Sequence, residues 1–83
     1  SDKQGWGSQG LFGLARSRTR ISQYKAALPL LRLLHKNYPK SKVRADAYRL
    51  ELYCLYKLKK SKEYHRTFAM FRKAYPGQST KFE

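Results

Sequence analysis

The sequence has few of the residues on which metal, redox and catalytic chemistry depend. Cys54 is the only cysteine, so the chain can form neither an internal disulfide nor a cluster of metal-bound thiolates. The two histidines, His35 and His65, lie far apart in the sequence, and no HExxH pair or phosphate-binding glycine loop occurs. We therefore expect no enzyme activity and no cofactor. Cys54 is expected to be a small buried residue, His35 a partly buried one and His65 a surface one.

Acidic residues are also scarce. Five Asp and Glu stand against 19 Lys and Arg, which gives a formal net charge of +14. Only Asp46, Glu51 and Glu63 lie within the part of the chain that we expect to be helical. A charge of this size creates a potential of several kT that attracts acidic partners. An ordinary solvated surface can carry the same charge, so charge alone identifies no ligand.

Long apolar runs are absent as well. No run approaches the roughly 18 residues that a membrane span requires, and no signal-peptide pattern opens the chain, so we expect no transmembrane segment. The chain begins at Ser1 without Met. We expect a processed protein or a piece of a longer one. Its 41% hydrophobic content and its aromatic residues are enough for one small folded domain.

What the chain does contain is apolar residues at helical spacing, which predicts an all-α fold of about four helices. Leu11, Leu14 and Ala15 begin the apolar face of the first expected helix. The second expected helix precedes Tyr38, the third covers residues 42–58, and the fourth precedes Tyr75. The third helix should have neighbours on both sides, and the fourth should bury one face only. We expect a flexible arm over residues 1–10, with Trp6 folded onto the helices or free as a contact anchor. The helical domain spans 11–76, and 77–83 is a tail.

Local signals indicate where the helices begin and end. Pro29 predicts either a bend in the second helix or a later start for it. Tyr38-Pro39 and Tyr75-Pro76 should end the second and fourth helices, because the residue before a proline avoids the helical region. Four serines are candidate N-caps: Ser8, Ser22, Ser41 and Ser61.

The first half of the chain resembles a tetratricopeptide repeat. Its large and small residues match that repeat at eight positions: Leu11, Leu14, Ala15, Tyr24, Ala27, Leu31, Leu34 and Pro39. The second Tyr-Pro stop extends the resemblance over residues 8–76, although Glu51 stands where the second repeat should have Leu. The resemblance implies two antiparallel helix pairs in a short right-handed α-solenoid. Because solenoids of this kind need about three repeats, we expect flanking repeats, a partner or self-association.

The Tyr-Pro-x-Ser turn is most similar to that of bacterial cell-envelope members, such as outer-membrane assembly lipoproteins and Tol-system coordinators. This implies a periplasmic or envelope location. Members of the family hold peptides or partner domains on a concave face lined by the first helix of each pair. Carried onto this chain, the partner-binding positions are Phe12, Arg16, Arg20, Arg49, Tyr53, Tyr56 and Lys57. The resemblance places three further residues beside them: Gln9, Thr19 and Asp46.

Basic and aromatic side chains on one face suit an acidic or carboxylate-terminated peptide, because an Arg guanidinium can bind a carboxylate through two hydrogen bonds. The spacing of Phe12, Arg16 and Arg20 puts them on one helix face. We therefore expect a non-enzymatic protein-protein interaction module with an acidic partner. Two alternatives use the same charges: nucleic acid, with phosphates on Lys and bases on Tyr, and an anionic lipid or polymer.

Overall fold

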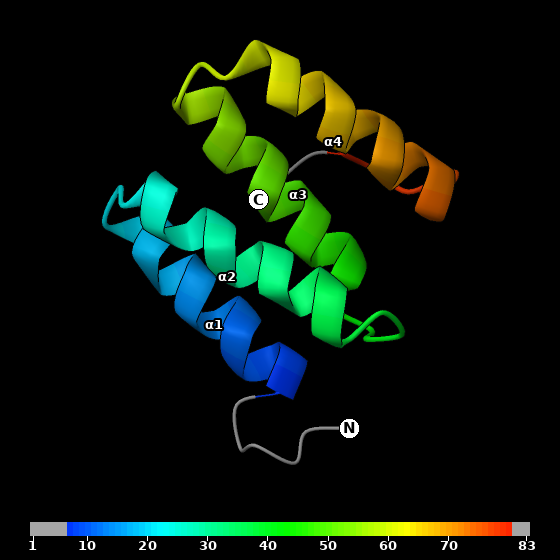
Figure 1. Cartoon of the computed structure of the whole chain (residues 1–83), viewed down its shortest axis with the longest axis horizontal. Helices are drawn as coiled ribbons and strands as arrows, with labels where there is room; N and C mark the ends of the chain where they lie inside the picture. Colours follow the sequence, from blue (N-terminus) through cyan, green and yellow to red (C-terminus); the bar gives the residue numbers. More distant parts are fainter. Residues whose placement is uncertain (1–6, 81–83) are drawn as a thin grey trace.

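The structure of the chain is a computed structural model that describes residues 7–80. Within this range it contains four α-helices and no strand, which confirms the all-α prediction: α1 (Gly7–Arg20), α2 (Tyr24–Asn37), α3 (Arg44–Lys57) and α4 (Ser61–Ala74). The helices lie side by side in chain order, with neighbours antiparallel (Figure 1). In addition to these neighbour contacts, α1 touches α3. The predictions for Trp6 and for residues 81–83 lie outside the described part of the chain.

The two helix pairs repeat with an offset of 37 residues. The helix α3 begins at residue 44 against residue 7 for α1, and α4 begins at 61 against 24 for α2. Tyr38 and Tyr75 hold equivalent positions as C-caps, and each donates its backbone N–H to the carbonyl four residues earlier. The expected helix ends before the two prolines are therefore correct.

The turns inside the two pairs also match. Ser22 and Lys59 have positive φ angles of 62° and 59°, the left-handed conformation that commonly follows the end of a helix. In the first turn the N–H of Gln23 donates to the carbonyl of Arg18 at 2.8 Å. The N–H of Lys60 donates to the carbonyl of Leu55 at 3.0 Å in the second. Each turn thus satisfies helix-terminal carbonyls through the backbone alone.

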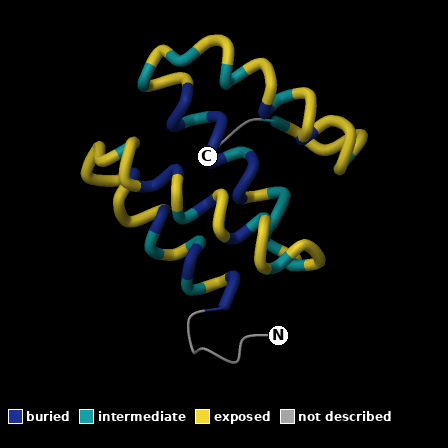
Figure 2. Tube along the Cα trace, in the orientation of Figure 1, coloured by how far each residue is buried: buried dark blue, intermediate teal, exposed yellow. Residues whose placement is uncertain are grey.

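The hydrophobic core has two parts, joined through α3. The first part lies between α1, α2 and α3 and includes Leu11, Ala15, Leu31 and Cys54. The second lies between α3 and α4, where the fully buried ring of Phe71 packs with residues of α3. Figure 2 shows buried positions along α3 and a largely exposed outer side on α4. The prediction that α3 has neighbours on two sides and α4 on one is confirmed.

The first helix begins earlier than expected. Residues 7–10 are part of α1, although their glycine content predicts a flexible arm. Tertiary contact explains the difference. Ser8 is buried, and the hydroxyls of Ser8 and Ser41 are hydrogen-bonded at 2.6 Å, which joins the start of α1 to the α2–α3 turn.

None of the four predicted serine N-caps is correct, since Ser8 lies inside α1 and Val43 is the N-cap residue of α3. Gln23 and Lys60 are the N-cap residues of α2 and α4, and neither makes a side-chain capping bond. Ser22 occupies the left-handed position of the preceding turn, and Ser61 is already helical. Ser41 comes closest to a capping role, since its hydroxyl accepts the N–H of Val43 at 3.2 Å.

The second helix continues through Pro29 from Tyr24 to Asn37, so it does not start late. Pro29 and Lys25, the residue four positions earlier, are both exposed. Water can therefore solvate the carbonyl that the proline leaves without a helical partner. Within residues 7–80, no helix is long and apolar enough to cross a membrane.

Candidate partner-binding surfaces

The line where α1 meets α3 is fixed by a buried contact. The hydroxyl of Thr19 lies 3.4 Å from the sulfur of Cys54 and also donates to the carbonyl of Ala15 at 2.8 Å. Thr19 is buried, so its predicted place among the partner-contacting residues is wrong, because it packs between the helices. Burial raises the pKa of the Cys54 thiol, an effect that the Thr19 contact opposes and the charge of Glu51 reinforces.

The α1 residues predicted for the binding surface lie on both sides of Thr19 in the sequence. Arg16 and Arg20 are exposed, and within residues 7–80 the structure gives neither of them an ion pair or hydrogen bond. Gln9 is exposed as well. Phe12 is half-buried and packs against the first core cluster. The structure thus leaves two exposed guanidinium groups on the helix that carries this partly covered ring.

On α3, Tyr53 and Lys57 flank Cys54. The ammonium of Lys57 lies 5.7 Å from the centre of the Tyr53 ring, and that ring meets Tyr24 of α2 edge-on at 6.1 Å. A ring held between a cation and a second ring has little rotamer freedom left to lose when a ligand binds. Together, Arg16, Arg20, Lys57, Phe12 and Tyr53 form what we call the α1–α3 surface.

Arg49 has a different environment from the one expected. It forms an ion pair with Asp46, and its guanidinium lies 5.8 Å from the centre of the Phe71 ring. It also donates to the carbonyl of Ser79 at 2.8 Å and to the side-chain oxygen of Gln78 at 3.4 Å. The chain turns back after α4 and brings residues 78–80 against α3. Arg49, Tyr56 and Thr80 line one small pocket. The structure therefore places Arg49 and Tyr56 with the chain's own C-terminal segment, and not with Arg16.

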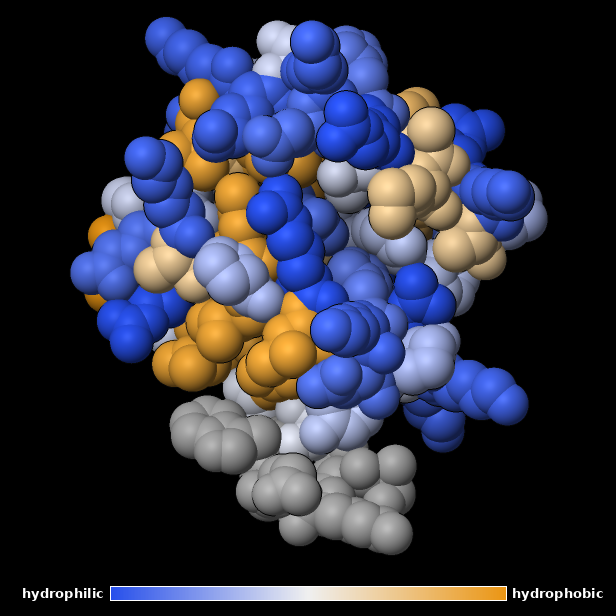
Figure 3. Space-filling model, in the orientation of Figure 1, coloured by the Kyte–Doolittle hydropathy of each residue, from blue (hydrophilic) through white to orange (hydrophobic). Residues whose placement is uncertain are grey.

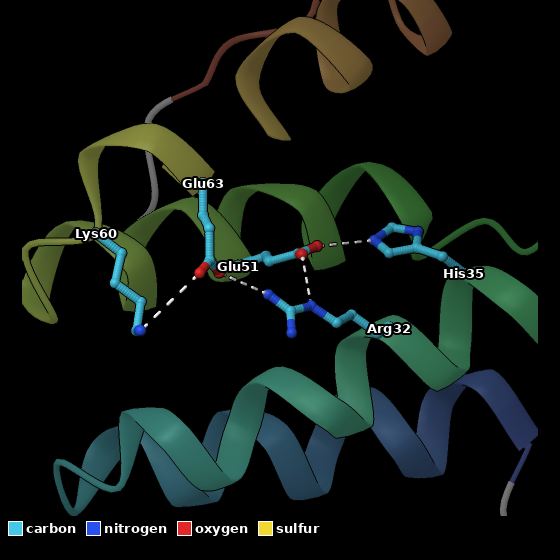
Figure 4. A network of polar contacts seen from close by, with 5 residues as sticks. All are labelled: Arg32, His35, Glu51, Lys60 and Glu63. Atoms are coloured by element: carbon cyan, nitrogen blue, oxygen red, sulfur yellow. Dashed lines mark hydrogen bonds and ion pairs between the residues drawn. The ribbon is translucent and has the colours of Figure 1, made fainter. Parts of the chain in front are cut away.

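A network of charges that the sequence did not reveal links α2, α3 and α4 (Figure 4). The carboxylate of Glu51 is buried on α3, with Arg32 at 3.6 Å and His35 at 3.3 Å, both from α2. Arg32 extends further to Glu63 of α4 at 3.1 Å, and Lys60 is 3.9 Å from the same carboxylate. A charged Glu51 can therefore stand where the resemblance expects Leu, because Arg32 and His35 face its carboxylate.

His35 is fixed from several sides. Its Nδ1 accepts a hydrogen bond from Nε of Arg44 at 3.1 Å, so the neutral ring carries its proton on Nε2. Nε2 faces the Glu51 carboxylate, and the ring of Tyr48 lies 4.0 Å away. Arg44 in turn donates to the carbonyl of Pro39 at 2.8 Å and to the hydroxyl of Tyr48 at 3.1 Å. His35 is therefore a partly buried structural residue, as expected, and His65 is exposed.

These side chains form the floor of an open groove of about 630 Å³ between α2 and α4. Lys36 and Arg66 on its sides are exposed. Because both carboxylates in the groove, those of Glu51 and Glu63, already face cations, the groove has no free acid.

Over the whole described range, the few carboxylates are paired and most of the cations are not. Residues 7–43 contain no Asp or Glu. The three carboxylates within residues 7–80 all belong to internal ion pairs. Figure 3 shows a face dominated by hydrophilic side chains, with apolar side chains gathered over α1 and α2. Most Lys and Arg side chains of this range therefore have no acidic partner within it.

Two further findings concern metal binding and relatives of the chain. Among residues 7–80, no group of three or more His, Cys, Asp or Glu side chains could hold a metal ion. Comparison of the chain with protein-family models, with curated proteins and with solved structures finds no match.

Proposed function

We propose that this chain is a tetratricopeptide-like interaction module that binds an acidic peptide or partner domain on the α1–α3 surface. One observation carries the proposal. The carboxylates of residues 7–80 are all paired internally, while Arg16 and Arg20 stay exposed with no acidic partner in this range. Burying a carboxylate costs free energy unless it is paired, so cations without partners favour an acidic ligand.

Each residue has a definite part in this proposal. Arg16 and Arg20 supply guanidinium forks for ligand carboxylates, and Lys57 adds a third positive charge next to Tyr53. Phe12 and Tyr53 supply apolar area whose position is set by packing against the core and against Tyr24. Arg49 and Tyr56 do not belong to this surface, because the C-terminal segment lies against them.

Nucleic acid is the second candidate, since Lys62, Arg66 and Lys73 are exposed along α4. Binding to single strands relies on exposed aromatic rings on which bases stack. Among the Phe and Tyr residues of the described range, only Tyr56 is exposed, at 69%. The neighbouring rings of Tyr53 and Tyr64 are half-buried, so bases have one open ring to stack on and the acidic peptide is the better match.

We also propose that the module is one part of a larger assembly, as envelope proteins of the resembled family are. Leu33 is 43% exposed on the side of α2 away from His35, and Leu30 beside it is only half-buried. Another helix pair packed there would cover both side chains, as in longer repeat arrays.

A binding experiment separates the candidates. Two fluorescent peptides with the same Asp- and Glu-rich composition in different orders, a single-stranded oligonucleotide and anionic vesicles are each titrated with the protein at several salt concentrations. A preference for one peptide order that persists at physiological salt supports the proposal. Equal binding of both peptides, together with tight, steeply salt-dependent binding of the oligonucleotide or vesicles, would reject it.

A further inference from the structure

The C-terminal segment, residues 78–80, lies on the outer face of the α3–α4 pair and makes specific contacts there. Arg49 donates to two acceptors of this segment, the Ser79 carbonyl at 2.8 Å and the Gln78 side-chain oxygen at 3.4 Å. The Arg49 side chain is only 17% exposed. The segment therefore covers a charged group that would otherwise face the surface.

Arg49 is held in place independently of the segment. Asp46, one turn earlier on α3, forms an ion pair with it, and the Phe71 ring of α4 lies beneath its guanidinium. A guanidinium fixed in this way presents its remaining N–H groups at a defined place. The two acceptors that the segment itself offers to Arg49, an amide oxygen and a backbone carbonyl, are neutral.

The face extends beyond the segment that lies on it. A pocket of about 150 Å³ adjoins Thr80 and is lined by Tyr53, Tyr56 and Tyr64. A second pocket of about 300 Å³ shares Tyr56 and Tyr64 and continues along the α3–α4 turn to Lys59 and Lys60. Tyr56 is 69% exposed at the junction of the two pockets. Among the described residues, the segment thus lies at one end of a longer groove lined by tyrosines and lysines.

We propose that this α3–α4 face is a second binding surface, that its partner is an extended acidic peptide, and that residues 78–80 occupy one end of it in the free protein. Charge complementarity selects the partner. A carboxylate in place of the Gln78 amide would form a charge-assisted hydrogen bond with Arg49, which is about twice as strong as a neutral one. Lys59 and Lys60 at the far end of the groove favour further acidic residues. The proposal rests on Arg49 and not on Arg16 or Arg20, although Tyr53 belongs both to this face and to the α1–α3 surface.

The segment then acts as an internal competitor. When a site is open only part of the time, the apparent affinity for an external ligand falls by the open fraction. Strengthening the hold of the segment on Arg49 must therefore weaken peptide binding, and loosening it must strengthen that binding. Gln78 is the residue to change, because it is exposed and outside every helix, so its substitution leaves the core untouched.

The test uses the full chain and a fluorescent synthetic copy of residues 75–83 that carries Gln78→Glu. We expect the Gln78→Ala protein to bind this probe about three- to tenfold more tightly than the parent protein does, because it loses one hydrogen bond of the competing segment. We expect the Gln78→Glu protein to bind the probe about tenfold more weakly. Equal affinity in the three proteins would overturn the proposal.

Two further variants separate this surface from the α1–α3 surface. Arg49→Lys keeps the charge but loses the guanidinium fork, and it should weaken probe binding by about tenfold with helical circular dichroism unchanged. Arg16→Glu should leave probe binding unchanged even if it abolishes binding at the α1–α3 surface. A probe that responds to Arg16→Glu and not to Arg49→Lys would overturn the proposal. Dimers that form by exchange of the segment and bind no probe would overturn it too, since they assign the face to a second copy.

Discussion

The hydroxyl of Thr19 and the sulfur of Cys54 lie 3.4 Å apart, which joins α1 to α3 inside the core. Because the Cys54 thiol is fully buried, its pKa is raised, and the unfolded chain ionises first as pH increases. The contribution of the Cys54 thiol to the free energy of unfolding is fully present below the unfolded pKa of about 8.5. It is lost as the pH rises from there toward the higher folded pKa. Urea unfolding should show this loss as the pH rises above about 8.5.

The variant Cys54→Ala isolates this effect from the titration of Lys and Tyr. We expect it to be less stable at neutral pH, by about 1–2 kcal/mol for the lost volume, and to have a flatter decline in alkaline solution. The same alkaline slope in parent and variant would show that Cys54 ionises equally in both states.

Glu51 gives the second prediction, because it is the buried centre of the α2–α4 network. Glu51→Ala removes the buried carboxylate that faces Arg32 and His35 and leaves a cavity, so we expect a loss of about 2–4 kcal/mol in the free energy of unfolding. Glu51→Gln keeps an acceptor oxygen and the volume, and should cost about half as much or less. Equal losses in the two variants, measured by urea unfolding, would mean that the network contributes nothing beyond packing.

The left-handed turn residues give the third prediction. Ser22 and Lys59 both adopt positive φ, which costs a residue with a side chain about 1 kcal/mol relative to glycine. Ser22→Gly and Lys59→Gly should therefore each raise the free energy of unfolding by about 0.5–1 kcal/mol. The exposed helical residue Ser17 is the matched control, since Ser17→Gly should lower it by about 0.5 kcal/mol. Destabilisation by all three glycines would contradict this account of the turns.

Helical periodicity predicted the four helices because burial on each is decided by local spacing, as in the stripe that includes Ala27, Leu31 and Leu34. The features that it missed depend on residues distant in sequence. Ser8 is helical because it meets Ser41, and Arg49 faces the C-terminal segment because Gly77, with φ of 89°, lies in the turn that precedes it.

The sequence predicted the exposure of the α1 site residues better than the surroundings of those on α3. The resemblance assigned Arg16 and Arg20, their spacing puts them on one helix face, and both are exposed. On α3 the same reasoning could not show that Arg49 meets the C-terminal segment whereas Lys57 lies beside Tyr53. This difference depends on where the chain goes after α4. Glu51 had one signal, a charge at a position where the repeat should have Leu.

The most direct measurement is the affinity of an Asp- and Glu-rich peptide, selected by its order-dependent binding, for charge-reversed variants at physiological salt. The account predicts that Arg16→Glu with Arg20→Glu weakens binding at least tenfold while helicity is retained. It predicts that the matched pair Lys62→Glu with Lys73→Glu, on the exposed side of α4, changes binding by less than about threefold. Equal weakening by the two pairs would contradict the account, because it would show that net charge, and not the α1–α3 surface, holds the peptide.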